Sequence, residues 1–514
     1  MLSRIISCGL HGIDGYIVEV ESYISGGLPD FDIVGLADAA VRESKERVRA
    51  AIKNSGFEFA RRRITVNLAP ANMRKEGSIY DLSIALAILA ATGQVSLPAT
   101  AGMVFLGELS LDGGIRKIDG ALSMALCAKS TGQRGILLPA QNSGEAAVVK
   151  GIDVYGAASL IEVIDFLNGD LCLEPCAGIC DFDMLQKDND AAGSPKPDFS
   201  DVKGQNGVKR ALEIAASGSH NCLMIGPPGS GKSMLAGRLP GILPDMTFEE
   251  ALEVTKIYSI SGLLPSNIPL ITQRPFRSPH HSVTQAGLIG GGKYPKPGEI
   301  SLAHNGVLFL DEVTEYGGSL LETLRQPLEE GKVHIARLNA TLTFPASVTL
   351  ICAANPCRCG NRFEKNKKCT CTPGQLRDYM NRLSGPLLDR IDIHIEAASV
   401  VYDDLSGQGM AESSAVIRKR VNRARKIQTL RYYGTGIYSN SQLTPSMLDK
   451  YCRPCLKGEK LLKRAFDKLG LSARAYGRIL KVSRTIADMD DCEEIQAAHI
   501  AEAIQYRTLD RRAI

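Results

Sequence analysis

The sequence of 514 residues contains no tryptophan, no internal repeat and no long low-complexity tract, and its apolar runs are short. A helix that crosses a membrane needs roughly 20 consecutive apolar residues, and no stretch approaches that length. The apolar run within residues 1–9 is too short for the core of a secretory signal. These absences argue against a membrane protein and a secreted protein, and we expect a cytoplasmic location without a membrane partner.

The 14 cysteines are therefore expected to be reduced thiols, some of which can bind metal. Three of them, Cys172, Cys176 and Cys180, lie in the polar segment 168–200, which is rich in proline, glycine, aspartate and asparagine. That composition is typical of a linker between domains. We interpret these three cysteines as linker thiols, because no fourth obvious ligand lies nearby.

A chain of this length is expected to hold about three domains. Residues 1–167 form the first predicted domain, and the linker at 168–200 separates it from the rest. Within this domain the periodicity of apolar residues predicts two strands and two helices. The predicted strands are 16–21 and 63–68, and the predicted helices are 39–54 and 82–91.

Residues 201–400 have the pattern of a nucleotide-binding α/β domain, and residues 401–514 that of a helical module. The net charge of +4 is unevenly distributed, because residues 413–514 carry 21 Lys and Arg against 10 Asp and Glu. A basic module suits nucleic acid. The alternative is a set of solvated helix surfaces whose charge is balanced by a neighbouring acidic domain.

One octapeptide carries the clearest chemical signal. It fits the pattern G-x-x-x-x-G-K-[ST] of phosphate-binding loops. An apolar stretch at 222–225 predicts a buried strand before it, and a helix is expected to begin after it. Its residues are Gly226, Pro227, Pro228, Gly229, Ser230, Gly231, Lys232 and Ser233. Backbone N–H groups and the helix N-terminus would bind phosphates, Lys232 would reach the β- and γ-phosphates, and Ser233 would ligate Mg²⁺. The motif predicts a site for ATP or GTP.

Two further apolar strands end in polar residues that suit the same site. The strand 307–310 is followed by Asp311 and Glu312, which can hold Mg²⁺ and polarise the attacking water. The alternative for this pair is a cap on the next helix. The strand 348–354 is followed by Asn355, which can orient the lytic water and sense the γ-phosphate.

The motifs at 276–282, 297–306, 311–312, 355–357 and 382–392 resemble those of magnesium-chelatase-like AAA+ ATPases, and most closely the bacterial ComM/YifB group. The resemblance covers essentially the whole chain. It implies an α/β fold with an AAA+ P-loop core and a helical lid. It also implies a preceding Lon-protease-like (ribosomal protein S5 domain 2-like) α+β domain. Members are expected to hydrolyse ATP with Mg²⁺ as homo-hexameric rings.

The same resemblance assigns roles to single residues. Asn355 takes the sensor position, and Arg390 takes the position of an arginine finger donated to the neighbouring subunit's nucleotide. The alternative for Arg390 is a local ion pair with Asp389 or Asp392. Arg474 is expected to approach ATP from the lid, with Arg478 one turn later as the competing residue.

Two segments of the ATPase domain are predicted to contact a substrate. Residues 276–298 form a Gly-, His- and Lys/Arg-rich insertion, and residues 333–344 read as a hairpin. In related ring helicases such elements project into the central pore, where Lys293, Lys332 or Arg337 would meet DNA phosphates without sequence preference. The alternative is a hairpin that serves only subunit packing. The adjacent His280 and His281 fit interface or substrate contacts better than a metal site.

Four cysteines follow the sensor position in a C-x-C-x₉-C-x-C pattern: Cys357, Cys359, Cys369 and Cys371. Four thiolates so close in sequence can enclose a tetrahedral Zn²⁺, whose role would be structural because no ligand position stays open. The spacing differs from the usual C-x₂-C knuckle. The alternatives are a reduced cysteine-rich loop and thiols that pair under oxidation.

The resemblance of the first domain to Lon-type Ser/Lys proteases calls for a check on catalysis. Asp81 takes the position of the nucleophilic serine, and Leu122 takes that of the lysine base. Ser78 and Ser83 are displaced from the nucleophile position, and Lys117 could act as base only in a shifted register. A serine without its base is a poor nucleophile. We therefore expect an inactive scaffold or substrate collar.

Together these features predict an ATP-driven ring motor that acts on single-stranded or branched DNA. The resemblance implies branch migration or helicase activity in recombination or natural transformation. Two alternatives stay open because one core serves distinct functions. They are a magnesium-chelatase-type metal-insertion motor and a protein-remodelling ATPase.

Overall fold

The computed structural model describes residues 1–178, 182, 184–186, 197–265, 267–292, 295–337, 340–362, 364, 367–399 and 411–507. The chain forms two compact units. The first comprises Met1–Gln186 with Phe248–Ile271, and the second comprises Lys187–Thr247 with Thr272–Ile514. The boundaries predicted at residues 167, 200 and 400 did not include residues 248–271 in the first unit.

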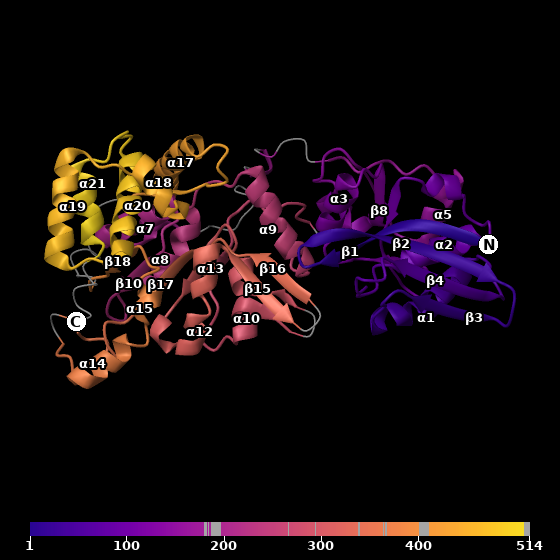
Figure 1. Cartoon of the computed structure of the whole chain (residues 1–514), viewed down its shortest axis with the longest axis horizontal. Coiled ribbons are helices and arrows are strands. Elements are labelled where there is room, and N and C mark those ends of the chain that lie inside the picture. Colours follow the sequence, from indigo (N-terminus) through magenta and orange to yellow (C-terminus); the bar gives the residue numbers. More distant parts are fainter. Residues whose placement is uncertain are drawn as a thin grey trace. The chain divides into compact units, whose positions relative to one another are not determined.

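The first unit is built on a mixed seven-stranded sheet in the order β3-β4-β2-β1-β5-β8-β9 (Figure 1). Its strands are β1 (Leu2–His11), β2 (Asp14–Ser25), β3 (Asp30–Val34), β4 (Arg63–Ala69), β5 (Met103–Phe105), β8 (Gly135–Pro139) and β9 (Asp153–Ala157), and β6 (Glu108–Leu109) and β7 (Ile115–Arg116) form a small separate ladder. β1 pairs antiparallel with β2, and β2 antiparallel with β4, whereas the remaining pairs are parallel. The two strands predicted from periodicity are both present.

The α-helices whose bounds the structure describes in this unit are α1 (Ala39–Asn54), α2 (Asp81–Ala91), α3 (Ala121–Ser130), α4 (Ser143–Ala146), α5 (Leu160–Asn168) and α9 (Phe248–Ile260). α2 is buried along its whole length, as expected of a helix that is apolar on all sides. α9 buries Ala251, Val254 and Ile257 and packs on α3. Ser259 at the end of α9 accepts a hydrogen bond from the backbone N–H of Gly120 at 3.2 Å. These contacts explain why α9 joins the first unit although it follows the phosphate-loop motif in sequence.

The second unit is built on a parallel five-stranded sheet in the order β11-β14-β17-β10-β18. The strands are β10 (Cys222–Ile225), β11 (Phe276–Arg277), β14 (Val307–Leu310), β17 (Thr349–Ala354) and β18 (Ile393–Glu396). β10, β14 and β17 are buried at every residue, which is typical of parallel strands covered on both faces. Two short ladders accompany the sheet: β12 (Gly290–Gly291) with β13 (Lys296–Pro297), and β15 (Lys332–Arg337) with β16 (Ala340–Pro345).

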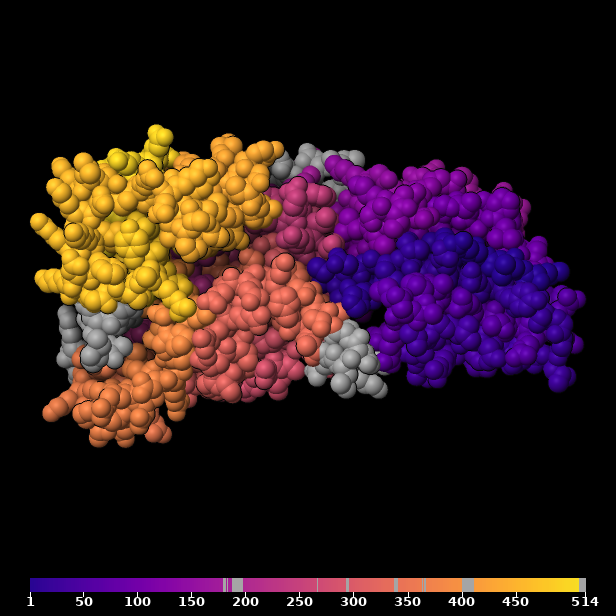
Figure 2. Space-filling model, in the orientation of Figure 1, coloured from indigo at the N-terminus to yellow at the C-terminus, as the bar shows by residue number. Residues whose placement is uncertain are grey.

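The helices of the sheet-bearing part are α7 (Asn206–Gly218), α8 (Lys232–Arg238), α10 (Gln285–Ile289), α11 (Glu299–Leu302), α12 (Gly318–Glu322), α13 (Arg325–Glu330), α14 (Pro373–Met380) and α15 (Gly385–Leu388). The lid consists of α17 (Ser414–Arg431), η6 (Asn440–Gln442), α18 (Pro445–Tyr451), α19 (Leu456–Leu469), α20 (Ala473–Met489) and α21 (Ala497–Gln505). In Figure 2 the orange and yellow atoms of the lid form one continuous surface. Among the described residues, no helix combines the length and the apolar character that crossing a bilayer requires.

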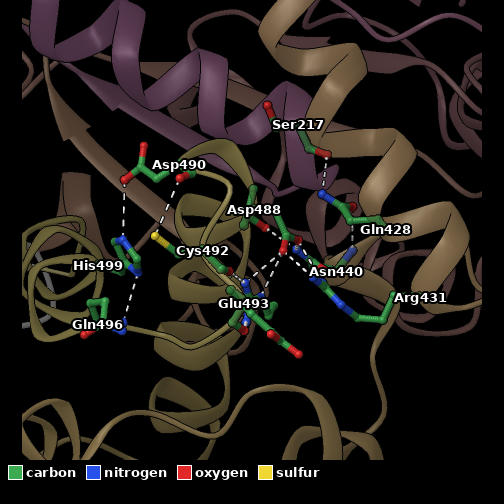
Figure 3. Close-up of polar contacts among 12 residues, drawn as sticks. Ser217, Gln428, Arg431, Asn440, Asp488, Asp490, Cys492, Glu493, Gln496 and His499 are labelled. Carbon is green, nitrogen blue, oxygen red and sulfur yellow. Dashed lines mark hydrogen bonds and ion pairs between the residues drawn. The ribbon is translucent and has the colours of Figure 1, made fainter.

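A buried carboxylate holds the lid helices together (Figure 3). Asp488 of α20 accepts hydrogen bonds from Arg431 of α17 at 2.9 Å, from Asn440 of η6 at 2.9 Å and from Arg484 at 3.0 Å. Gln428 of α17 donates to the carbonyl of Ser217 in α7 at 3.1 Å and so ties the lid to the sheet-bearing part of the same unit. All three partners donate to the same buried carboxylate. These hydrogen bonds therefore favour one arrangement of the lid segments.

Candidate nucleotide-binding site

The strand order of the parallel sheet brings three sequence motifs to one edge. β17 lies between β10 and β14, with Ile225 opposite Ala354 and Leu310 opposite Cys352. The residues that follow these strands are the phosphate-loop motif, Asn355 and Asp311. Because parallel strands end at the same edge, their following loops converge, and ligands of open α/β sheets bind at that edge.

Glycines shape the loop that follows β10. A side chain at Gly226 would bring its Cβ within 2.3 Å of the carbonyl oxygen of Ala397, so the strand end packs against β18 only with glycine there. Gly229 and Gly231 have φ angles of 78° and 85°, which favour glycine, and no atom lies within 4 Å of a Cβ built at either. The loop therefore leaves open space above its backbone, as a cradle for phosphates requires.

Lys232, the first residue of α8, holds its amine inside this loop. Its Nζ donates to the carbonyls of Gly226 at 2.7 Å and Pro227 at 2.9 Å, and lies 3.4 Å from Oδ1 of Asn355. Burial lowers the pKa of Lys232, while the charges of Asp311 and Glu312 act in the opposite direction. The amine thus lies inside the loop, within hydrogen-bond reach of Asn355.

Ser233 and Asp311 meet at the mouth of the loop. The hydroxyl of Ser233 donates to Oδ2 of Asp311 at 2.6 Å. Hydroxyl and carboxylate oxygens are hard ligands of the kind that Mg²⁺ prefers. The pair, with the open cradle beside it, fits a Mg²⁺–nucleotide complex.

Glu312 adopts an unusual backbone conformation beside this pair. Its φ and ψ are 47° and 48°, in the left-handed region that non-glycine residues rarely occupy. Its N–H donates to Oδ1 of Asp311 at 2.9 Å, and its side chain is exposed. Strain of this kind costs on the order of 1–3 kcal/mol and concentrates at functional sites. Glu312 also stands at the N-cap position of the short helix η5 (Val313–Glu315), but its side chain makes no capping hydrogen bond. The helix-cap alternative therefore holds for its backbone position, while the exposed carboxylate fits a functional role.

Gln205 was not predicted from the sequence, and it holds the phosphate-binding loop through hydrogen bonds to backbone carbonyls. Its side-chain amide donates to the carbonyl of Ser230 at 3.1 Å and to that of Ala398. Gln205 also has a positive φ of 54°. The available signal was its place between Gly204 and Asn206 just before a helix, which by itself indicates only a turn.

Arg390 does not lie free at the surface of this chain. Its side chain is 7% exposed and forms an ion pair with Glu329 of α13. It also donates to the carbonyls of Pro386 at 2.6 Å and Arg325 at 3.2 Å. The local partner is therefore Glu329, and neither of the two aspartates considered from the sequence. To reach a neighbour's phosphate, the guanidinium must leave Glu329, whose own side chain is 53% exposed.

The two lid arginines differ in their exposure and in whether a buried carboxylate holds them. Arg478 is 20% exposed and is held by an ion pair with the buried Asp392. Burial acts to raise the pKa of Asp392, but Arg478, His220 and Lys481 together outweigh it, and the pKa lies well below the usual range. Arg474 is 64% exposed and lies 3.5 Å from Asp389. Arg474 is the arginine that can turn toward a ligand without uncovering a buried carboxylate.

The hairpin predicted within 333–344 is formed by β15 and β16, which are fully paired from Lys332 opposite Pro345 to Arg337 opposite Ala340. Lys332 is exposed at the base of the hairpin. Arg337 is the last residue of β15, and Lys293 lies outside the described residues. His280 and His281 are exposed with ring centroids 3.9 Å apart, and the metal-ligand clusters of the described residues do not include them.

Much of the positive charge of the C-terminal module is paired. Seven of its arginines form ion pairs with carboxylates: Arg418, Arg420, Arg423, Arg431, Arg474, Arg478 and Arg484. α19 differs, because its basic residues are exposed and form no ion pair within the described part of the chain. They are Lys457, Lys460, Lys463, Arg464 and Lys468. Carboxylates of the lid and of the neighbouring sheet-bearing part thus balance part of the charge of the described module, but not that of α19.

The four cysteines after Asn355 converge. Their Sγ atoms all lie within 4.8 Å of one another, and Cys357 is buried while Cys359, Cys369 and Cys371 are half-buried. The four are free thiols. Backbone N–H groups of Asn361 and Thr370 donate to Cys359 and lower its pKa to about 5. The cluster meets the first requirement of a tetrahedral metal site, since four thiolates converge on one point.

The first unit offers no activated nucleophile at the position expected from protease resemblance. Asp81 begins α2, is fully buried and accepts hydrogen bonds from Ser44 and from Arg47, the latter at 2.7 Å. Burial raises the pKa of Asp81, against the hydrogen bonds of Arg47 and Ser44. Leu122 is buried in α3. Asp81 therefore serves packing between α1 and α2.

The neighbouring serines are also without a base. Ser78 donates to Glu108, and the buried Ser83 donates to a backbone carbonyl at 2.9 Å. Lys117 donates to the carbonyl of Leu264 at 3.1 Å. Neither serine is hydrogen-bonded to a lysine within the described residues.

Comparison with known proteins gives the same relationship along the whole chain. Three family models match: magnesium chelatase, subunit ChlI, over residues 198–405; subunit ChlI of Mg-chelatase over 20–142; and the ChlI C-terminal model over 411–507. The competence protein ComM of Haemophilus influenzae is 42% identical over 513 residues, which are 99% of this chain and 98% of that protein.

The uncharacterized protein YifB of Salmonella typhimurium is 43% identical over 505 residues, or 98% of this chain and 96% of that protein. The maternal DNA replication licensing factor mcm6 of Xenopus tropicalis is more distant, at 21% identity over 62% of this chain and 37% of its own length. With end-to-end similarity and a P-loop site on a parallel sheet, the chain belongs to the ComM/YifB family of magnesium-chelatase-like AAA+ ATPases.

Proposed function

We propose that the chain hydrolyses ATP at the loop after β10 and uses the energy to move DNA. The observation that carries the hydrolysis step is the convergence of Lys232, Asn355 and the Ser233–Asp311 pair at one sheet edge. Lys232 would bind the β- and γ-phosphates, and Ser233 and Asp311 would hold Mg²⁺, which neutralises charge on the phosphates. Glu312 would accept a proton from the attacking water, and Asn355 would orient that water.

Arg390 and Arg474 would complete the site in an assembled ring. Arg390 would act on the nucleotide of the neighbouring subunit, since it lies away from the loop of its own chain and is bound to Glu329. Arg474 would approach from the lid of the same chain. A homo-hexamer is the assembly that we propose, because a heterologous interface closes most simply into a ring.

DNA as the substrate is supported by two relatives. One is called a competence protein and the other a DNA replication licensing factor. In this chain the β15–β16 hairpin carries Lys332 at its base, and α19 carries five exposed basic residues. These positive charges would bind phosphates irrespective of sequence. We propose branch migration or unwinding of single-stranded or branched DNA during recombination or natural transformation.

The first test is an ATP-driven branch-migration assay on a three-strand DNA junction. Wild-type protein is expected to give product, whereas Lys232→Ala and Glu312→Gln are expected to give none and to lose ATP turnover. Lys332→Ala should keep basal turnover but bind DNA more weakly, with a salt dependence reduced by about one phosphate contact. Lys129→Ala, an exposed lysine of the first unit, is the matched control. Undiminished ATP turnover in Lys232→Ala would refute the assigned site.

A second function stays in view because the matching family models carry the name magnesium chelatase. A metal-insertion motor would hydrolyse ATP at the same residues but respond to a porphyrin-bearing partner protein. ATP turnover that is indifferent to DNA would favour this motor or a protein-remodelling ATPase. Turnover that rises with junction DNA would favour the DNA motor.

A further inference from the structure

The four-cysteine cluster has the dimensions of a metal site. The Sγ of Cys357 lies 3.4 Å from that of Cys359 and 3.7 Å from that of Cys369, and Cys359 and Cys369 are 3.6 Å apart. A zinc–thiolate bond of about 2.3 Å places the sulfurs of a regular tetrahedron about 3.8 Å apart. The distances are far longer than the S–S bond of a disulfide, which is about 2.05 Å. These three sulfur–sulfur distances are thus close to the edge length of a zinc–thiolate tetrahedron.

The surroundings of the cluster suit a bound metal. Four thiolates around Zn²⁺ carry a net charge of −2. The described residues between the first and last cysteine include Arg358, Arg362, Lys367 and Lys368 against the single Glu364. Backbone N–H groups of Asn361 and Thr370 donate hydrogen bonds to the sulfur of Cys359, and such donors orient and stabilise the thiolate ligands of metal sites. Charge and donors therefore both favour thiolates around a cation.

The loop that carries the cluster has little else to hold it. No helix or strand is described between the end of β17 at Ala354 and the start of α14 at Pro373. A metal that joins both ends of such a loop supplies the binding energy that secondary structure does not. The cluster begins two residues after Asn355, so the order of the loop directly affects the position of Asn355.

The loop also touches the phosphate-binding loop. Gly360 has a φ of 78°, and a Cβ built on it would lie 2.6 Å from Cδ of Pro228. In α14, which follows the loop, the hydroxyl of Tyr379 accepts a hydrogen bond from the hydroxyl of Thr314 at 2.7 Å. Thr314 follows the Asp311–Glu312 pair by two residues. The loop therefore contacts the phosphate-binding loop, and the helix that follows it contacts a residue near Asp311 and Glu312.

We propose that Cys357, Cys359, Cys369 and Cys371 bind one Zn²⁺, and that the zinc-bound loop clamps Pro228 and Asn355 in the geometry that nucleotide binding needs. The metal site stands independently of ATP hydrolysis, whereas the clamp rests on the proposed ATPase function. Zinc would take no part in the chemistry, because four protein ligands leave no position for water.

Elemental analysis of the purified full chain tests the metal site. One zinc per chain is expected in the wild type, and loss of it in the double variant Cys359→Ser/Cys369→Ser. Cys172→Ser, which removes an exposed thiol outside the cluster, should retain the metal. If the double variant does not fold, titrating wild-type thiols with a mercurial should release one zinc as four thiols react. A wild-type chain that takes up no Zn²⁺ under reducing conditions, binds iron instead, or forms disulfides in the cluster overturns the proposal.

The clamp is tested by Gly360→Ala, which keeps all four ligands but sets a methyl group against Pro228. We expect full zinc content with ATP affinity or turnover lowered by about tenfold or more, since misplacement by an ångström can cost up to about 10²-fold. Gly434→Ala is the matched control, because Gly434 has a similar φ of 77° and a Cβ built on it would have no atom within 4 Å. Wild-type turnover in zinc-loaded Gly360→Ala overturns the clamp. An inactive wild type with one bound zinc would instead contradict only the ATPase function.

Discussion

At the residue scale, the proposed mechanism depends on which group the Arg390 guanidinium contacts. Arg390→Ala is expected to lower ATP turnover by about 10³-fold or more, because an arginine finger stabilises charge in the transition state. The same substitution also breaks the ion pair with Glu329. Glu329→Gln breaks that pair but leaves the guanidinium, and it should turn over ATP at close to the wild-type rate. Steady-state phosphate release by both variants distinguishes the two roles of Arg390. Equal losses of turnover in Arg390→Ala and Glu329→Gln would mean that the ion pair with Glu329, and not an arginine finger, accounts for the effect.

His394 of β18 gives a second residue-scale prediction, on stability. Burial, then the positive charge of Arg507, lowers the pKa of His394 to about 3. The unfolded chain binds a proton near pH 6.5 while the folded chain does not. The contribution of His394 to the free energy of unfolding is therefore constant above about pH 6.5 and falls by about 1.4 kcal/mol per pH unit between there and about pH 3. Urea unfolding of the wild type and of His394→Phe at pH 7 and pH 5 measures this, and an identical pH dependence of the two proteins would contradict it.

Residue types and spacings were enough to predict which side chains meet at the nucleotide site. Lys232, Asp311 and Asn355 each follow an apolar strand, and parallel strands bring such positions to one edge. The same reasoning could not find Glu329 as the partner of Arg390, because an ion pair between α13 and the segment after α15 depends on side-chain rotamers and on helix placement. Gln205 was missed for a related reason, since its function lies in contacts with two backbone carbonyls.

At the scale of elements, the lid depends on one carboxylate shared by three segments. Asp488→Asn is expected to destabilise the lid by about 3–5 kcal/mol, because it leaves the buried Arg484 and half-buried Arg431 without their counter-charge. Asp490→Asn removes an exposed carboxylate 3.4 Å from His499 and should cost under about 1 kcal/mol. Figure 3 shows both sites in one view. Hydrogen exchange of α17 and α20 amides in both variants tests the contrast, and equal exchange would refute it.

The elements themselves were predictable where periodicity was strong. The helix at 39–54, the helix at 82–91 and the hairpin within 333–344 all form as expected. The attachment of α9 to the first unit was not predictable, because its apolar positions specify a buried face but not the helix that buries it. Tertiary contacts determine that α9 packs on α3, and the local sequence pattern does not specify them.

At the scale of the whole molecule, the proposed ring requires that each active site be shared by two chains. Lys232→Ala would remove phosphate binding from a chain while leaving its Arg390 intact, and Arg390→Ala would do the reverse. Neither variant alone should hydrolyse ATP. In mixed assemblies, however, a chain with intact Lys232 can meet a neighbour with intact Arg390, so activity should reappear.

The expected recovery follows from random assembly. In an equal mixture a competent interface needs one chain of each kind in a fixed order, which gives about a quarter of the wild-type turnover per site in a head-to-tail ring. Mixing either variant with the double variant Lys232→Ala/Arg390→Ala brings no new competent pair, and serves as the control for refolding and dilution effects. Mass photometry of the mixture establishes that mixed assemblies form. Mixed assemblies that remain inactive would mean that Arg390 does not act across a subunit interface, and its ion pair with Glu329 would then be its functional contact.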